Sequence, residues 1–203
     1  MTANEFWNWF SLNNSKYLFL SEVDPLEKEK LLEEFQHTLH RYCEELHFEI
    51  GGHPNGDQEV IITAEGKSEY FDVVEELVDH APKLKDWVFI ALKQASGFRH
   101  TIEYMGVKYD PLQLWFLPLE SKKNPGDIGI RVGHQVFDSE REDVTLWATY
   151  LLVHKCLGEK ASTFDIQHVE VGALPENPEE KGYLEFTKLQ EYIDWKKRKR
   201  NGQ

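Results

Sequence analysis

Cysteine is scarce in this chain of 203 residues, which contains only Cys43 and Cys156. Small secreted domains depend on dense disulfide frameworks, and two cysteines in separate predicted helices cannot form one. The N-terminus lacks a continuous hydrophobic run followed by a small-residue cleavage site, so we do not interpret it as a signal peptide. No stretch approaches the ~18 uninterrupted apolar residues that span a bilayer. We therefore expect a cytoplasmic protein with no membrane partner.

An excess of basic residues is also missing. The chain has 36 acidic against 23 basic side chains, a formal net charge of −13. Such a charge repels phosphate backbones and anionic lipid, and it favours solubility. The composition therefore disfavours nucleic acid as a partner and makes another protein the expected partner class, while it leaves the oligomeric state open.

The common catalytic motifs are absent. The sequence has no Gly-x-Ser-x-Gly elbow, no phosphate-binding loop with Lys-Ser/Thr, no Gly-x-Gly-x-x-Gly and no His-Glu-x-x-His. Acidic pairs such as Glu75 with Glu76 are too common in an acidic chain to indicate a glycosidase. We therefore predict no cofactor, identify no catalytic residue, and lean against an enzyme.

What the sequence does contain is a regular succession of elements. Asp24 as N-cap, Pro25 at the first helical position and apolar residues at helical spacing predict a helix over residues 26–46. Strands are predicted over 47–50 and 59–65, and "GGHPNGDQ" between them supplies hairpin turn residues. A helix over 69–80 and a strand over 87–93 complete this half.

A similar succession follows in the second half. The runs 101–110, 112–120 and 128–136 read as strands, and "SKKNPGD" joins the last two. A helix over 141–157, with Val144, Trp147, Ala148 and Leu151 on one face, leads to a strand over 163–171.

These patterns predict an α+β fold in a single domain, residues 1–203. It comprises two ββαβ-like halves, 47–93 and 112–171, which form a mixed or antiparallel sheet with helices on one face. An N-terminal helix and a C-terminal helix near 186–197 frame them. The aromatic residues near the N-terminus, Phe6, Trp7, Trp9 and Phe10, are predicted to pack back on the core.

Several segments look familiar as a set: "APKLKDW", "YDPLQLWFLPLE", "IGIRVG", "LGEKASTFDIQHVEVGALPENPEEKGYL" and "YIDWKKRK". Together they make the chain, from Phe6 to Arg198, resemble an uncharacterised family of bacterial cytosolic proteins. The resemblance implies a bacterial origin and a fold in one piece. It implies no activity and no catalytic residues.

One helix face carries metal-ligand residue types. Glu33, His37, His40 and Glu44 fall within an arc of about 60° if the helix is regular, and imidazole and carboxylate suit zinc, iron or manganese. A metal-dependent hydrolase centred on these four residues is one alternative function. The face lies off the apolar stripe, however, and one exposed helix lacks second-shell partners, so a solvated polar face is favoured and no metal is predicted.

The block Trp195 to Arg200, "WKKRKR", is the one basic run and carries the other alternative, nucleic-acid binding. Cations at a helix C-terminus also complement the helix dipole, so a solvated helix end is favoured. Folding of this block onto the acidic body is a third interpretation.

A last candidate site is an aromatic and basic patch for an anion or a partner carboxylate. Strand alternation turns Arg131 away from the apolar side, and we predict that it joins His134, Trp115 and Tyr104 on an uncovered part of the sheet. The same alternation predicts that His168 is buried with Phe164 and Ile166. The leading hypothesis is a non-enzymatic protein-binding module with a regulatory or immunity-like role, and this patch is its expected contact.

Overall fold

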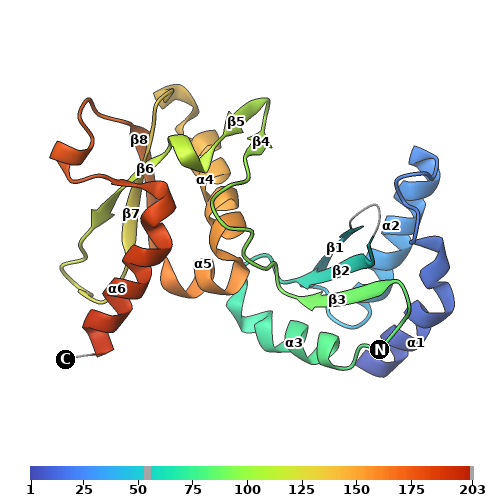
Figure 1. Cartoon of the computed structure of the whole chain (residues 1–203). Coiled ribbons are helices and arrows are strands. Elements are labelled where there is room, and N and C mark those ends of the chain that lie inside the picture. Colours follow the sequence, from blue (N-terminus) through green and yellow to red (C-terminus); the bar gives the residue numbers. More distant parts are fainter. Residues whose placement is uncertain (53–55, 202–203) are drawn as a thin grey trace. The chain divides into compact units, whose positions relative to one another are not determined.

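The structure is a computed structural model that describes residues 1–52 and 56–201 (Figure 1). Contacts divide the chain into two compact units, Met1–Lys93 and Gln94–Gln203, which are described separately below. Both units combine helices with small sheets, so the predicted α+β class is confirmed. Helices also lie near both ends of the chain, as predicted. The single-domain assignment of residues 1–203 stays a prediction.

Two capped helices begin the first unit: α1 (Ala3–Asn13) and α2 (Pro25–His40). The Thr2 hydroxyl accepts from the Glu5 amide at 3.3 Å, and the Thr2 amide donates to the Glu5 carboxylate at 2.7 Å, a capping box. Asp24 accepts from the Leu26 amide at 3.0 Å, so its predicted capping role is confirmed.

The predicted C-terminal end of the second helix is wrong, because α2 ends at His40 rather than Leu46. The chain then turns, with the Tyr42 amide bonded to the Leu39 carbonyl at 2.9 Å and the Leu46 amide bonded to the Cys43 carbonyl at 3.3 Å. Leu46 is fully buried from within this turn. The helical spacing of apolar residues therefore extends beyond the end of α2, because the turn that follows packs against the same core.

A three-stranded sheet completes the first unit. Its strands are β1 (His47–Gly52), β2 (Gln58–Thr63) and β3 (Trp87–Ala91). Helix α3 (Phe71–Asp79) lies between β2 and β3 in the sequence. Strand β1 pairs antiparallel with β2, and β2 pairs parallel with β3. The predicted turn residues 53–55 lie outside the described residues.

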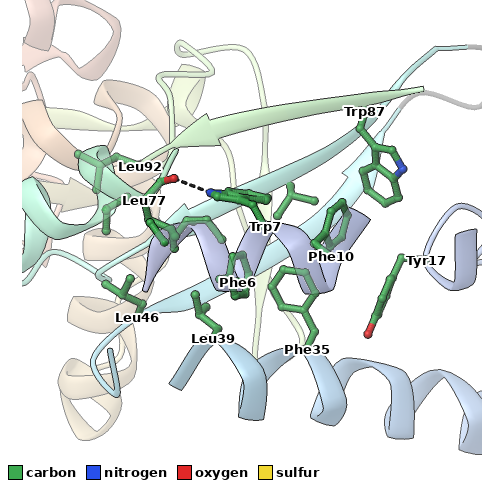
Figure 2. Close-up of a cluster of buried hydrophobic side chains, with 14 of the residues drawn as sticks. Phe6, Trp7, Phe10, Tyr17, Phe35, Leu39, Leu46, Leu77, Trp87 and Leu92 are labelled. Atoms are coloured by element: carbon green, nitrogen blue, oxygen red, sulfur yellow. Dashed lines mark hydrogen bonds between the residues drawn. The ribbon is translucent and has the colours of Figure 1, made fainter. Parts of the chain in front are cut away.

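The core of this unit is unusually aromatic (Figure 2). Phe6 and Phe10 of α1 meet Phe35 of α2, and the rings of Phe10 and Phe35 lie edge to face at 5.9 Å. The Trp7 ring lies 4.5 Å from that of Phe89 in β3. The Trp7 indole donates to the Leu77 carbonyl of α3 at 2.6 Å, which ties α1 to α3 and satisfies the buried N–H. The prediction that the N-terminal aromatics pack back on the core is confirmed.

The second unit begins with a hairpin where a single strand over 101–110 was predicted. Strands β4 (Ile102–Tyr104) and β5 (Val107–Tyr109) pair antiparallel. Met105 and Gly106 between them have φ of 49° and 76°, the left-handed geometry that a two-residue hairpin turn requires. The Met-Gly pair hid this turn, because methionine is not a typical turn residue.

A four-stranded sheet forms the centre of the second unit, in the order β8-β7-β6-β9. The strands are β6 (Trp115–Leu119), β7 (Gly129–His134), β8 (His168–Ala173) and β9 (Leu184–Glu185). Strand β6 pairs antiparallel with β7, and β7 pairs parallel with β8, the same sequence of pairings as β1, β2 and β3. That the two segments form a structural repeat stays a prediction.

Three helices belong to this unit: α4 (Glu142–Leu157), α5 (Glu159–Asp165) and α6 (Leu189–Asn201). Residues 163–165, predicted as the start of a strand, end α5 instead, and the strand begins only at His168. A second buried cluster joins Phe116 and Ile130 of the sheet to Leu152 of α4 and Ile193 of α6. No helix in the described part of the chain is both long enough and apolar enough to cross a membrane.

Candidate functional site

Arg131 lies on an open part of the four-stranded sheet, but another residue of the same chain already pairs with it. Its Nε and Nη2 donate to Oε2 of Glu170 at 2.8 and 2.5 Å. Nε2 of His168 lies 3.0 Å from the other Glu170 oxygen. Hydrogen bonds from His168 and then Arg131 lower the pKa of Glu170. The three side chains form a charge-compensated row, so a partner carboxylate would have to displace Glu170 from Arg131.

The structure brings only part of the predicted patch together. Trp115 is the register partner of Gly133, so it shares the sheet face of Arg131. His134 lies on the opposite face and is only 3% exposed. Tyr104 belongs to the separate β4-β5 sheet and packs, partly buried, against the core of this unit. The four residues therefore do not share one surface, and binding by Arg131 and Trp115 stays a prediction.

His134 is buried within the second unit and is not exposed on its surface. Its Nε2 lies 3.1 Å from the Thr149 hydroxyl of α4, and its ring meets the Tyr109 ring edge to face at 5.8 Å. Burial lowers the pKa of His134 to about 4. The imidazole is thus neutral at pH 7 and joins β7 to α4.

His168 was predicted to be buried, but it lies on the surface. It is exposed at the first residue of β8, where it contacts Glu170, and is not buried with Phe164 and Ile166. The alternation that placed these residues together was applied across the end of α5, where the chain is not a strand.

The predicted metal face does not converge. Glu33, His37 and His40 lie on α2, but Glu44 lies beyond the end of the helix. The His40 ring contacts the Gln36 amide and lies 6.3 Å from the His47 ring. Among residues 1–52 and 56–201, no three His, Cys, Asp or Glu side chains are grouped as a metal ion would require. The four side chains of this alternative are therefore not grouped in the structure, and the metal-dependent hydrolase stays an alternative prediction.

Helix α4 presents exposed apolar side chains. Trp147, Tyr150 and Leu151, here called the α4 stripe, are 63%, 37% and 48% exposed. The Trp147 and Tyr150 rings lie 6.3 Å apart. The buried side of the helix carries Ala148 and Leu152 instead. The single apolar face predicted for Trp147, Ala148 and Leu151 is therefore divided, because Ala148 is buried while Trp147 and Leu151 are exposed.

The basic C-terminal run lies on α6 and is partly engaged within its own unit. Lys197 donates to Asp165 at 2.7 Å, and the Lys199 ammonium lies 5.3 Å from the centre of the Trp195 ring. The first contact is a fold-back onto an acidic residue of the kind considered above. Nucleic-acid binding by Lys196 to Arg200 stays a prediction.

Comparison with known proteins adds no constraint. No protein-family model matches the chain, and comparisons with curated proteins and with solved structures gave no match. The resemblance to a bacterial cytosolic family therefore stays a prediction, and any function has to be argued from the side chains themselves.

Proposed function

We propose that this chain is a non-enzymatic protein-binding module, regulatory or immunity-like in role, which contacts its partner through the α4 stripe. One observation supports this proposal: three large apolar side chains lie exposed at positions i, i+3 and i+4 of one helix. Exposed apolar residues are normal when scattered singly, whereas a contiguous row is typical of an interaction surface.

The residue types in the α4 stripe suit a protein interface. Tryptophan and tyrosine are enriched among residues whose removal costs most binding energy, because their large rings bury much area for little lost conformational freedom. Asp143 and Lys155, exposed at opposite ends of the same helix, supply the polar rim that surrounds such a centre. The partner we expect is a protein with an apolar groove that accepts a helix face.

The α4 stripe is a better contact than the Arg131 row. Glu170 already compensates Arg131, so that a partner would gain little from a new ion pair there. The exposed apolar side chains of the α4 stripe, by contrast, gain from any contact that removes them from water.

The test is affinity capture from a lysate of the source organism with quantified recovery. We expect one protein to be recovered in near-stoichiometric amount by the wild-type chain. The double variant Trp147→Ser/Leu151→Ser should reduce that recovery at least about tenfold, because it removes the centre of the contact. Leu112→Ser is the matched control, since Leu112 is 65% exposed but lies outside α4.

Thermal unfolding of the same variants separates binding from folding. Exposed substitutions should leave the melting temperature nearly unchanged. A large fall in melting temperature for the double variant would mean that the side chains stabilise the chain itself. Equal recovery by all three proteins, or no recovered protein at all, would contradict the proposal.

A further inference from the structure

A second feature of the Gln94–Gln203 unit is a cavity of about 470 Å³ between the turn after β6 and the end of α6. Its size lies within the range of small-molecule sites. We call it the basic cleft, because four of its lining side chains are cationic and one is a carboxylate. These are Lys122, Lys196, Lys199 and Arg200, with Glu120 as the carboxylate.

Local sequence builds both walls of the basic cleft. In the turn, the Asn124 amide bonds to the Ser121 hydroxyl at 3.0 Å, and the Asp127 amide bonds to the Asn124 carbonyl at 2.9 Å. Gly126 lies close under the other wall: a Cβ added there would be 3.4 Å from Cδ of Arg200.

The helical wall follows from spacing. Lys196, Lys199 and Arg200 occupy positions i, i+3 and i+4 of α6, so they share one side of the helix and line the basic cleft together. Arg198, in the same basic run, does not line it. Because the run "WKKRKR" is helical, only some of its residues line the cavity, and the others lie on a different side of α6.

The cations of the basic cleft are poorly neutralised. Within the residues that the structure describes, Lys122, Lys196 and Arg200 have no carboxylate within ion-pair distance, whereas Lys197 is paired with Asp165. Favourable interaction with the negative end of a helix explains cations on the last turn of α6. It does not explain Lys122, which comes from the opposite wall.

The unit that holds the basic cleft carries little of the acidity of the chain. Residues 1–93 have 19 acidic and 8 basic side chains, a net charge of −11, while residues 94–203 have 17 and 15, a net charge of −2. Most of the negative charge therefore belongs to the other unit, and the unit that holds the basic cleft is almost neutral.

We propose that the basic cleft binds a compact polyphosphate group, two or more phosphates in succession, as in inorganic pyrophosphate or a nucleoside diphosphate. A guanidinium can hold phosphate oxygens in a two-pronged hydrogen bond, and ammonium groups add point charges around it. A compact ligand fits better than a nucleic-acid strand, because the unpaired cations gather in one bounded hollow and do not follow a stripe across the surface.

Isothermal titration of the full chain with inorganic pyrophosphate and, separately, with adenosine diphosphate tests the proposal. We expect binding by the wild-type protein that weakens with salt, because exposed charges are screened. Arg200→Gln should weaken it at least about tenfold, and Arg198→Gln is the matched control with the same charge change two residues away. Equal affinity for both ligands assigns recognition to the phosphates, and tighter binding of the nucleotide adds a nucleoside contact.

Three results would overturn the proposal. The first is no binding of either ligand. The second is equal weakening by Arg198→Gln and Arg200→Gln, which would indicate diffuse charge attraction. The third is binding of a single-stranded RNA that pyrophosphate fails to displace, which would favour the nucleic-acid alternative. None of these depends on the α4 stripe, so this site and the proposed protein contact can fail separately.

Discussion

At the scale of single residues, His134 couples folding to pH. The imidazole is neutral and buried in the folded chain, where its pKa is about 4, while an unfolded histidine titrates near 6.5. The unfolded state therefore takes up a proton first as the pH falls. We expect His134 to reduce the free energy of unfolding by about 2 kcal/mol between pH 7.5 and pH 5, with little further loss below pH 4.

Urea unfolding of the wild-type chain and of His134→Asn at both pH values measures this contribution. Asparagine can still bond to Thr149 but cannot titrate, so the variant should lose about 2 kcal/mol less than the wild type over the same pH interval. Carboxylates contribute equally to both proteins, and the comparison cancels them. Parallel pH profiles would show that His134 is accessible to protons in the folded state.

The same residue shows how far sequence reasoning reaches at this scale. Strand alternation predicted that Arg131 faces away from the apolar side, and the residue is indeed exposed. The alternation also puts His134 on the opposite face, yet the predicted patch combined the two. The Glu170 partner lies 39 residues away in sequence, and only the parallel pairing of β7 with β8 brings it to Arg131. The local sequence pattern predicts which way a side chain points. Its interaction partner depends on which strands pair in the folded chain.

At the scale of elements, the segment after β8 packs closely on one glycine of β7. A Cβ at Gly133 would lie 2.8 Å from Cδ1 of Leu174 and 3.1 Å from Cε1 of Tyr183. Its register partner on β8, Gly172, has only Arg131 Cδ near, at 3.9 Å, an ordinary van der Waals contact. Gly133→Ala should therefore lower the free energy of unfolding by about 1–3 kcal/mol, because the segment after β8 must move.

Gly172→Ala is the control in the same sheet and at the same register. It should change the free energy of unfolding by no more than about 0.5 kcal/mol, since the new methyl group makes only an ordinary contact with Arg131 and alanine restricts the unfolded chain. Equal effects of the two substitutions in urea unfolding would mean that strand propensity, and not the contact with Leu174 and Tyr183, sets the cost.

Some helices and strands were predicted correctly from the sequence and others were not, because apolar periodicity does not show where an element ends or what covers it. Capped or strongly alternating segments were found, as for the start of α2 and for β7. Two errors have the same origin. The apolar pattern of α2 extends beyond the end of the helix at His40, and α4 has apolar residues on both its core side and its exposed side. Periodicity identifies apolar positions, but it does not say what covers them, and so it placed the exposed Trp147 and Leu151 on one face with the buried Ala148.

At the scale of the whole chain, each unit has its own core. The buried cluster of Met1–Lys93 is drawn from residues 3–92, and that of Gln94–Gln203 from residues 109–193. Domains of about 100 residues can bury enough apolar surface to fold alone. We therefore predict that fragments 1–93 and 94–203 each fold independently, although the sequence pattern suggested a single domain.

The distribution of tryptophan makes this prediction easy to measure. Trp7, Trp9 and Trp87 belong to the first fragment, and Trp115, Trp147 and Trp195 to the second, so near-ultraviolet circular dichroism reports on both. We expect each fragment to give a structured spectrum and a cooperative urea transition, and the two spectra to sum to that of the full chain. A fragment without tertiary signal would show that its core needs the rest of the chain, because a cluster that cannot exclude water alone does not order its aromatic rings. The single-domain prediction for residues 1–203 would then be the correct one.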